Sequence, residues 1–319
     1  MTTRESAENY LEQESRMKQE FYERLREILG EEGQVLTEEP LKKHTTFRIG
    51  GPAKYFCLPR TPEQLAAVLK ACHALKESYY ILGNGSNVLV SDKGYDGVVI
   101  QLFQNWNEIR IEDRTLYAQA GALLVRAAHM AAKEGLTGLE FASGIPGTVG
   151  GALVMNAGAY GGEMKDVVRE ALVLTEQGEQ LRLTKEELEL GYRTSSVARE
   201  HYIVLEAVLD LEEGDQEAIE ARMQELKEAR TGKQPLEYPS AGSTFKRPEG
   251  YFAGKLIMDA GLRGFRVGDA QVSEKHCGFV INRGEATAQN VLELVSHVQQ
   301  EVQRRFGVEL ELEMKLLGF

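Results

Sequence analysis

Two glycine-rich loops are the segments of this 319-residue chain whose composition best suits phosphate binding. The first is Gly83-Asn84-Gly85-Ser86-Asn87, and the second lies within residues 143–162. Glycine lets the backbone approach a ligand closely, and successive N–H groups can then form a nest for an anion. The first loop fails G-x-G-x-x-G at Val88, and the second lacks the G-K-[ST] ending. The residues alone leave two readings open, tight turns between strands or a cradle for a ligand with two phosphates.

Arg193 stands among hydroxyl side chains in residues 192–196, after a charged stretch. An arginine in such a place is by default a solvated loop residue. Its planar guanidinium is equally suited to clamping a carboxylate or a phosphate. The sequence pattern does not choose between these two interpretations.

Segment 239–248 carries serines beside basic residues. Neither Ser240 nor Ser243 satisfies G-x-S-x-G, so a Ser-His-Asp hydrolase has little support. Between residues 231 and 266, six Lys or Arg residues oppose three acidic ones, a local charge of 6 − 3 = +3 in a chain of net charge −12. Such a stretch fits a polyanionic small ligand, with ordinary scatter of charge as the alternative.

The last segment, residues 308–316, alternates apolar and charged side chains, which predicts a half-buried strand. Glu309, Glu311 and Glu313 share its polar face, where solvation is the default, and periodicity singles out none of them. His276 has no partner at a metal-ligand spacing, so no metal site is predicted.

The elements that must position these residues indicate an α+β or mixed α/β chain. Thr61, Pro62 and Gln64 predict a capped helix start, and Gly307 predicts the stop of the last long helix. Helices are expected over 17–28, 61–72, 123–133, 219–231 and 291–302, and strands over 79–82, 88–90, 98–102, 203–211 and 308–316. We expect a loop over 232–250 and a domain boundary near residue 213.

Composition excludes several classes of protein. Hydrophobic residues make up 42% and charged residues 27%, which is typical of globular chains. The net charge of −12 argues against a general nucleic-acid binder. Cys57, Cys72 and Cys277 are too few and too far apart for a disulfide framework, so we expect reduced thiols in a cytosolic protein. The sequence shows no 18-residue apolar run and no secretory signal, so neither a membrane span nor export is expected.

Six motifs occur in one order: residues 44–53, 83–87, 144–161, 192–193, 241–246 and 310–318. This series resembles the UDP-N-acetylenolpyruvoylglucosamine reductase family, the flavoenzymes of bacterial peptidoglycan precursor synthesis. The resemblance runs from about residue 40 to residue 318. The short interval between the 219–230 helix and Ser243 resembles the shorter type, which lacks an extra tyrosine-bearing loop.

The resemblance implies an FAD-binding unit of the vanillyl-alcohol-oxidase (PCMH) type with a C-terminal α+β substrate domain. The expected boundaries are 36–212 for the FAD unit, with two α+β subdomains of about 36–100 and 101–212, and 213–306 for the substrate domain. Residues 307–319 would return to the active site as a strand. An N-terminal helical extension, residues 1–35, lies outside the resemblance and receives no role.

Carried over motif by motif, the resemblance implies Arg193 and Glu313 as catalytic residues and Ser243 as the proton donor. Non-covalent FAD would lie on Gly83, Asn84, Gly85, Ser86, Asn87, Ser143, Gly144, Gly147, Thr148, Gly150, Gly151, Asn156, Ala157 and Gly158. The substrate would meet Tyr192, Lys233, Lys246, Arg247 and His276.

The implied reaction is the NADPH-dependent reduction of UDP-N-acetylglucosamine enolpyruvate to UDP-N-acetylmuramate in the cytoplasm. Its partners would be NADPH and the UDP-sugar, without nucleic acid or membrane, and a monomer is compatible with the sequence. Two other hypotheses stay open, a related flavin oxidase with another substrate and a non-catalytic nucleotide-binding module. Arg193, Ser243 and Glu313 together at motif positions disfavour the second.

Overall fold

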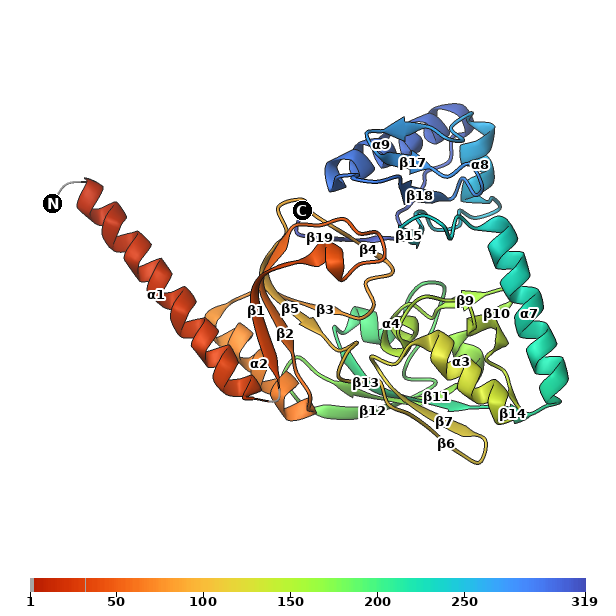
Figure 1. Ribbon diagram of the computed structural model, residues 1–319, viewed down its shortest axis with the longest axis horizontal. Helices are drawn as coiled ribbons and strands as arrows, with labels where there is room; N and C mark the ends of the chain where they lie inside the picture. The colour runs from red at the N-terminus through yellow and green to blue at the C-terminus, as the bar shows by residue number, and fades with distance from the viewer. Residues whose placement is uncertain (1–2, 32) are drawn as a thin grey trace.

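The computed structural model describes residues 3–31 and 33–319, with side chains from residue 16 onwards except residue 32. Its first element is α1 (Thr3–Leu29), which extends away from the rest of the molecule (Figure 1). Phe21, Leu25 and Leu29 are buried, whereas Met17 is 62% exposed. The helix expected over residues 17–28 is therefore confirmed, and its C-terminal half packs on the body.

The first sheet has the strand order β1-β2-β5-β3, with β1 antiparallel to β2 and the other pairs parallel. The strands are β1 (Gln34–Pro40), β2 (Pro52–Leu58), β3 (Tyr79–Leu82) and β5 (Tyr95–Gln101), and α2 (Pro62–Leu75) joins β2 to β3. Thr61 caps α2 by accepting from the Gln64 N–H, as predicted. The side chain of Gln64 completes the cap one residue earlier than expected, because its Oε1 accepts from the Arg60 N–H at 2.8 Å.

The second sheet is antiparallel throughout, in the order β12-β11-β13-β7-β6. Its strands are β6 (Ile109–Glu112), β7 (Thr115–Gln119), β11 (Val168–Leu174), β12 (Gln180–Thr184) and β13 (Ile203–Asp210). The helices α3 (Leu124–Lys133) and α4 (Val149–Val154) follow β7 in the chain. Short elements complete this part: η1 (Leu41–Lys43), β8 (Leu136–Thr137), η2 (Glu140–Ala142), β9 (Gly158–Ala159), β10 (Gly162–Glu163), α5 (Met164–Val167), α6 (Ser196–Arg199) and β14 (Glu212–Glu213).

Helix α7 (Gln216–Lys233) leads from this sheet to a third one, of order β15-β18-β17-β16 (Figure 1). Its elements are β15 (Ser240–Ser243), α8 (Ala253–Asp259), β16 (Arg266–Val267), β17 (Ala270–Val272), β18 (Phe279–Asn282) and α9 (Ala288–Phe306). Gly307 ends α9 at a φ of 68°, as predicted. The expected loop over 232–250 is wrong in part, because β15 lies within it and pairs with β18.

The C-terminal segment crosses back to the first part of the chain, where β19 (Lys315–Leu317) pairs in parallel with β4 (Val88–Val90), as Figure 1 shows. The predicted strand over 308–316 is therefore mostly wrong. Its alternation also fails at the end, because Leu316 is 43% exposed and Leu317 is buried. The partner is β4 rather than a neighbour along the chain, and sequence periodicity cannot identify such a partner.

No helix in the described part of the chain is long and apolar enough to cross a membrane.

Candidate active site

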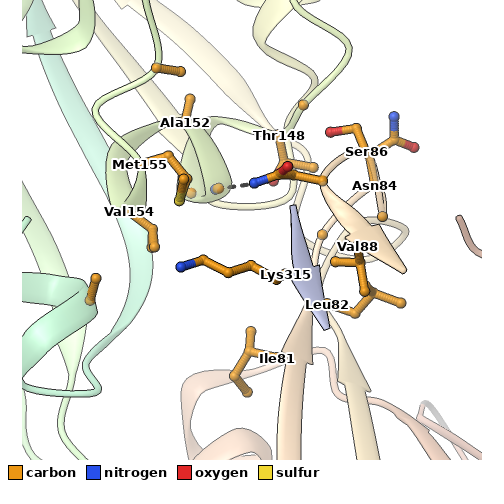
Figure 2. Close-up of a pocket in the computed structure, with 18 of the residues that line it drawn as sticks. Ile81, Leu82, Asn84, Ser86, Val88, Thr148, Ala152, Val154, Met155 and Lys315 are labelled. Carbon is orange, nitrogen blue, oxygen red and sulfur yellow. Dashed lines mark hydrogen bonds between the residues drawn. The ribbon is translucent and has the colours of Figure 1, made fainter. Parts of the chain in front are cut away.

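A cavity of about 860 Å³ lies where the two glycine loops, β13, α7, β15 and the C-terminal segment meet. Figure 2 shows Asn84, Ser86 and Thr148 on one side of it and Ile81, Val154 and Met155 around its interior. Its volume lies within the range of cofactor and ligand sites. The cavity brings together segments that lie more than 200 residues apart in the sequence. For example, the Asn87 side chain donates a hydrogen bond to the carbonyl of Glu313, 226 residues further along the chain.

The first glycine loop connects β3 to β4 and requires glycine for steric reasons. Gly85 has a φ of +60°, and a Cβ there would lie 2.1 Å from the carbonyl oxygen of His44. At Gly83 a Cβ would lie 2.6 Å from Oγ1 of Thr148, so the two glycine loops are in close contact. Asn84 strengthens this contact by donating to the carbonyl of Pro146. The five residues predicted in this loop all line the cavity.

The second loop ends where Thr148 caps α4 by accepting from the Gly151 N–H at 3.3 Å. A Cβ on Gly147 would meet no atom closer than Oγ of Ser86, at 3.6 Å, and would stand in the space between the loops. Gly147 does not have a positive φ, so space for a ligand, rather than backbone strain, explains the absence of a side chain. A cradle that a single Cβ would fill fits the diphosphate of a dinucleotide such as FAD.

We expect Gly147→Val to weaken FAD binding while leaving the fold intact. The valine side chain would fill the cradle and displace one or two backbone contacts to the diphosphate. Hydrogen bonds to charged groups contribute about 1.5–3 kcal/mol each, so the Kd for FAD should rise about 10- to 100-fold or more. Fluorescence titration of the apoprotein measures this change, with far-UV circular dichroism as the check on folding. An unchanged Kd would place the diphosphate elsewhere.

Three predicted cofactor residues lie outside the cavity lining, and their surroundings explain why. Ser143 donates its hydroxyl to the carbonyl of Glu140 at 2.8 Å, and Gly144 packs against the Arg230 side chain. Asn156 is 1% exposed, so it cannot face a ligand. Its amide instead donates to Gly191 and accepts from the Lys165 N–H. The other predicted cofactor residues, Gly147, Thr148, Gly150, Gly151, Ala157 and Gly158, line the cavity.

Arg193 lines the cavity from a tight turn over residues 191–194, in which its own φ is +55°. A left-handed conformation is unusual for arginine, so the surroundings must enforce it. Asn156 donates to the carbonyl of Gly191 at 3.0 Å, and the Ser195 hydroxyl donates to the carbonyl of Val154 at 2.8 Å. Both ends of the turn are thereby fixed to the segment that follows the second glycine loop.

Glu313 lies opposite Arg193, with its Oε1 2.7 Å from Nε of the guanidinium. The Glu313 side chain is only 14% exposed, so the default expectation of a solvated carboxylate is wrong at this position. Burial raises the pKa of the Glu313 carboxyl, while the positive charges of Arg193, Lys246 and Lys315 act to lower it. The net effect is a raised pKa, so the Glu313 carboxyl accepts a proton more readily than that of a solvated glutamate.

Ser243 reaches the cavity from the end of β15. The adjacent residue ties this strand to the C-terminal segment, because the Thr244 carbonyl accepts from the Glu313 N–H at 3.0 Å. Asn87 of the first glycine loop in turn donates to the Glu313 carbonyl at 3.2 Å. The three residues predicted as catalytic, Arg193, Ser243 and Glu313, therefore line one cavity, together with both glycine loops.

The predicted substrate residues lie outside this lining. Tyr192 is 56% exposed, and its hydroxyl accepts from the backbone N–H of Arg247 at 3.0 Å. Lys246 forms an ion pair with Glu311, which is 72% exposed. Tyr192 and Arg247 are thus exposed near Arg193 and Ser243, with the half-buried Lys246 beside them.

The two other predicted substrate residues lie elsewhere. Lys233 is exposed at the last position of α7. His276 accepts from the Gly278 N–H through Nδ1, and burial lowers the pKa of its imidazole. Neither Lys233 nor His276 is among the residues that line the cavity.

Several polar residues that line the cavity were not predicted from the sequence, among them Lys315, Arg230 and Gln234. In Figure 2 the Lys315 side chain points into the cavity, towards Val154 and Met155. It follows Glu313 by two residues, so the alternation of the segment already put the two on one face. Gln234 has a buried Oε1 without a hydrogen-bond partner, and no sequence pattern distinguishes it or Arg230.

Comparisons with known proteins agree on one family. The FAD binding domain family matches residues 53–184, and the family described as UDP-N-acetylenolpyruvoylglucosamine reductase, C-terminal domain, matches residues 234–317. A reductase of that name from Clostridium tetani is 54% identical over 299 residues, which cover 94% of this chain and 97% of its own. The reductase from Alkaliphilus metalliredigens is 51% identical, covering 94% and 99% of the two chains.

A solved structure gives the same result. The UDP-N-acetylenolpyruvylglucosamine reductase from Thermus caldophilus superposes with a TM-score of 0.76 at 40% identity, covering 89% of this chain and 98% of its own.

Proposed function

The chain belongs to the UDP-N-acetylenolpyruvoylglucosamine reductase family, and from that premise we propose how its own residues carry the reaction. It is an oxidoreductase that reduces UDP-N-acetylglucosamine enolpyruvate to UDP-N-acetylmuramate in peptidoglycan synthesis, with FAD as cofactor and NADPH as reductant. Its fold combines an FAD-binding unit of the vanillyl-alcohol-oxidase type with a C-terminal α+β unit. When bound, FAD takes reducing equivalents from NADPH and passes them to C3 of the enolpyruvyl group.

The glycine loops would hold the diphosphate of FAD through backbone N–H groups of residues 83–87 and 147–151. Lys315 and Arg230 line the same cavity and would supply positive charge to it, and the partial burial of Arg230 strengthens its attraction to an anion. We assign no attachment residue, and FAD is expected to be non-covalent.

Arg193 and Glu313 would act where negative charge develops, on C2 and the adjoining carboxylate of the substrate. The observation that supports this assignment is their separation of 2.7 Å inside the cavity, with Ser243 in the same lining. The guanidinium would bind the substrate carboxylate, and a protonated Glu313 would donate a hydrogen bond to it. Ser243 would transfer its hydroxyl proton to C2, which completes the addition of two hydrogens across the double bond.

The substrate carboxylate would thus replace Glu313 as the anion that Arg193 binds. Tyr192, Lys246 and Arg247 would face the rest of the UDP-sugar, since they lie close in sequence to the catalytic residues Arg193 and Ser243 and the Tyr192 hydroxyl joins them through the Arg247 N–H. Lys233 and His276 stay predictions from the resemblance.

We propose the domain boundaries expected from the sequence. The FAD-binding match, residues 53–184, lies within the expected FAD unit, whereas the match over residues 234–317 covers most of the expected substrate domain and extends into the C-terminal segment. We also propose a cytoplasmic location. The three cysteines, Cys57, Cys72 and Cys277, are buried free thiols, as is usual in a reducing compartment.

Anaerobic half-reactions test the proposed function directly. NADPH should bleach the flavin absorbance of the holoprotein, and UDP-N-acetylglucosamine enolpyruvate should restore it within one turnover. UDP-N-acetylglucosamine, which lacks the enolpyruvyl group, should not. Acid precipitation should release all of the yellow colour as FAD. A reduced protein that the enolpyruvyl substrate fails to reoxidise would favour a flavin oxidase with another substrate.

Substrate binding should take up a proton at Glu313. Its folded pKa is raised by burial, and Arg193 opposes that rise. When a second carboxylate occupies Arg193, the opposing effect weakens and the pKa of Glu313 rises further. Binding to the oxidised enzyme should therefore take up as much as one proton, and affinity should fall with rising pH by up to about tenfold per unit.

Calorimetry in two buffers of different ionisation enthalpy measures this uptake. Glu313→Gln is the matched control, because it keeps the shape of the side chain and removes the titrating group. Proton release on binding, or the same uptake in the Gln variant, would contradict the assignment.

A further inference from the structure

Thr46 joins two parts of the active site that lie far apart in the sequence. It belongs to the loop between η1 and β2, and its backbone N–H donates to the carbonyl of Gly85 at 3.1 Å. Its Oγ1 donates to the carbonyl of Ser240 at 2.7 Å, across a separation of 194 residues. Gly85 lies in the first glycine loop, and Ser240 is the first residue of β15. One residue therefore bonds to the expected FAD cradle and to the strand that carries Ser243.

The two segments that Thr46 joins, the first glycine loop and β15, both pack closely on their surroundings. Gly85 packs so closely on the neighbouring backbone that a Cβ would lie 2.1 Å from the carbonyl oxygen of His44. Phe47, next to Thr46, is 1% exposed and belongs to the same apolar cluster as Ala241 and Phe245. Thr46 is bonded to the glycine loop through its backbone and to β15 through its side chain, so it can transmit the position of the loop to the strand.

The strand is firmly held just beyond Ser243, where the Thr244 N–H donates to the carbonyl of Gly278 at 2.9 Å and Thr244 Oγ1 accepts from the Val280 N–H at 3.0 Å. Its pairing with β18 is limited to Ser240 with Ile281 and Ser243 with Phe279, and the register shifts between them. Gly242 in that interval has a φ of +73°. The bonds of Thr244 therefore hold the strand on one side of Ser243, and the Thr46 bond to Ser240 holds it on the other side, where the irregular interval begins.

We propose that Thr46 is a positioning residue for Ser243. Its hydroxyl fixes β15 relative to the first glycine loop, and so sets the distance over which the Ser243 proton must travel to C2 of the substrate. Thr46 is not among the residues that line the cavity, so it acts through Ser240 and Ser243. This inference rests on the proposed role of Ser243.

Thr46→Val tests the proposal, since valine keeps the shape of threonine and removes the donor. A displacement of about 1 Å can cost as much as 10²-fold in rate, so we expect reoxidation by the enolpyruvyl substrate to slow about 10- to 100-fold. The Kd for FAD, the KM for the UDP-sugar and the rate of flavin reduction by NADPH should stay within about twofold. Thr46→Ser keeps the hydroxyl and should restore reoxidation to nearly the parent rate.

Thr115→Val is the matched control. Thr115 also donates its hydroxyl across strands, to Asp210 at 3.2 Å, but lies outside the cavity lining, and its variant should react like the parent. A Thr46→Val protein that loses FAD, or slows in both half-reactions alike, would show a merely structural role and overturn the proposal. So would a Thr46→Ser variant as slow as Thr46→Val.

A double-mutant cycle separates this proposal from the role of Ser243. If Thr46 acts through Ser243, Thr46→Val should add less than about twofold to the defect of Ser243→Ala. A full additional loss in that background would overturn the positioning role, even if Ser243 remains the proton donor. Normal reoxidation by Ser243→Ala alone would instead overturn the proposed function of Ser243.

Discussion

Arg193→Lys should lower kcat for substrate reduction about 10²- to 10³-fold while FAD remains bound. Lysine keeps the charge but loses the planar pair of donors that binds a carboxylate in two places. The ammonium group that replaces the guanidinium can pair with Glu313 or with the substrate carboxylate, but it cannot align two donors with either. Because charge develops on the substrate carboxylate only during reduction, kcat should fall much more than the affinity for substrate. Steady-state kinetics with stopped-flow reoxidation measure both effects.

The matched control for this variant is Arg182→Lys. Arg182 also pairs with a carboxylate, that of Glu170 at 2.8 Å, but between the edge strand β12 and its neighbour β11 in the second sheet, outside the cavity lining. Its substitution should leave both half-reactions unchanged. If Arg193→Lys retained full kcat, the guanidinium would serve only to neutralise Glu313, and the stabilising role would pass to another group.

The local signals in the sequence predicted much of this site. The two glycine loops line one cavity, and Arg193, Ser243 and Glu313 converge on it. Periodicity found α2, α3, α7 and α9, because each has an apolar stripe that packs on a core. The roles of the three side chains came from resemblance, and the structure adds the geometry that makes those roles physically coherent.

Long-range pairing accounts for what the sequence did not predict. The strand β15 is four residues long and contains Gly242, so it carries no alternating pattern of its own. The pairing of β19 with β4 joins segments more than 220 residues apart and places Glu313 at a cavity rather than in solvent. Asn156 lies in a glycine-rich motif, but only its surroundings reveal that it holds the Arg193 turn.

The catalytic side chains are attached to the same segments that form the cofactor cradle. The first glycine loop bonds to Glu313 through Asn87 and reaches β15 through Thr46. The segment after the second loop holds the turn of Arg193 through Asn156 and Val154. Any displacement of the loops would move the reacting groups with them. Such coupling keeps the groups that stabilise charge and donate the proton in register with the bound cofactor.

Ser243→Ala should leave FAD binding and flavin reduction by NADPH near normal, and should slow reoxidation by the enolpyruvyl substrate at least 10⁴-fold. General acid catalysis contributes roughly 10²–10⁴-fold, and the upper end applies when no nearby group can substitute. Neither neighbouring group can readily replace it, because Lys246 forms an ion pair with Glu311 and the proton of Glu313 would be hydrogen-bonded to the substrate carboxylate. Ser243 is exposed to the cavity, so losing its hydroxyl should not affect folding.

Stopped-flow absorbance in the flavin band separates the two half-reactions of this variant. Ser243→Cys is the informative companion, since a thiol can still carry a proton to carbon and should retain part of the activity. Ser240→Ala controls for the loss of a serine hydroxyl on the same strand, and it leaves intact the Ser240 carbonyl that Thr46 binds. If Ser243→Ala were reoxidised as fast as the parent, Ser243 would only line the cavity. If it failed in the NADPH step instead, the hydroxyl would belong to nicotinamide binding, because proton delivery to C2 matters only after the reducing equivalents have reached the substrate.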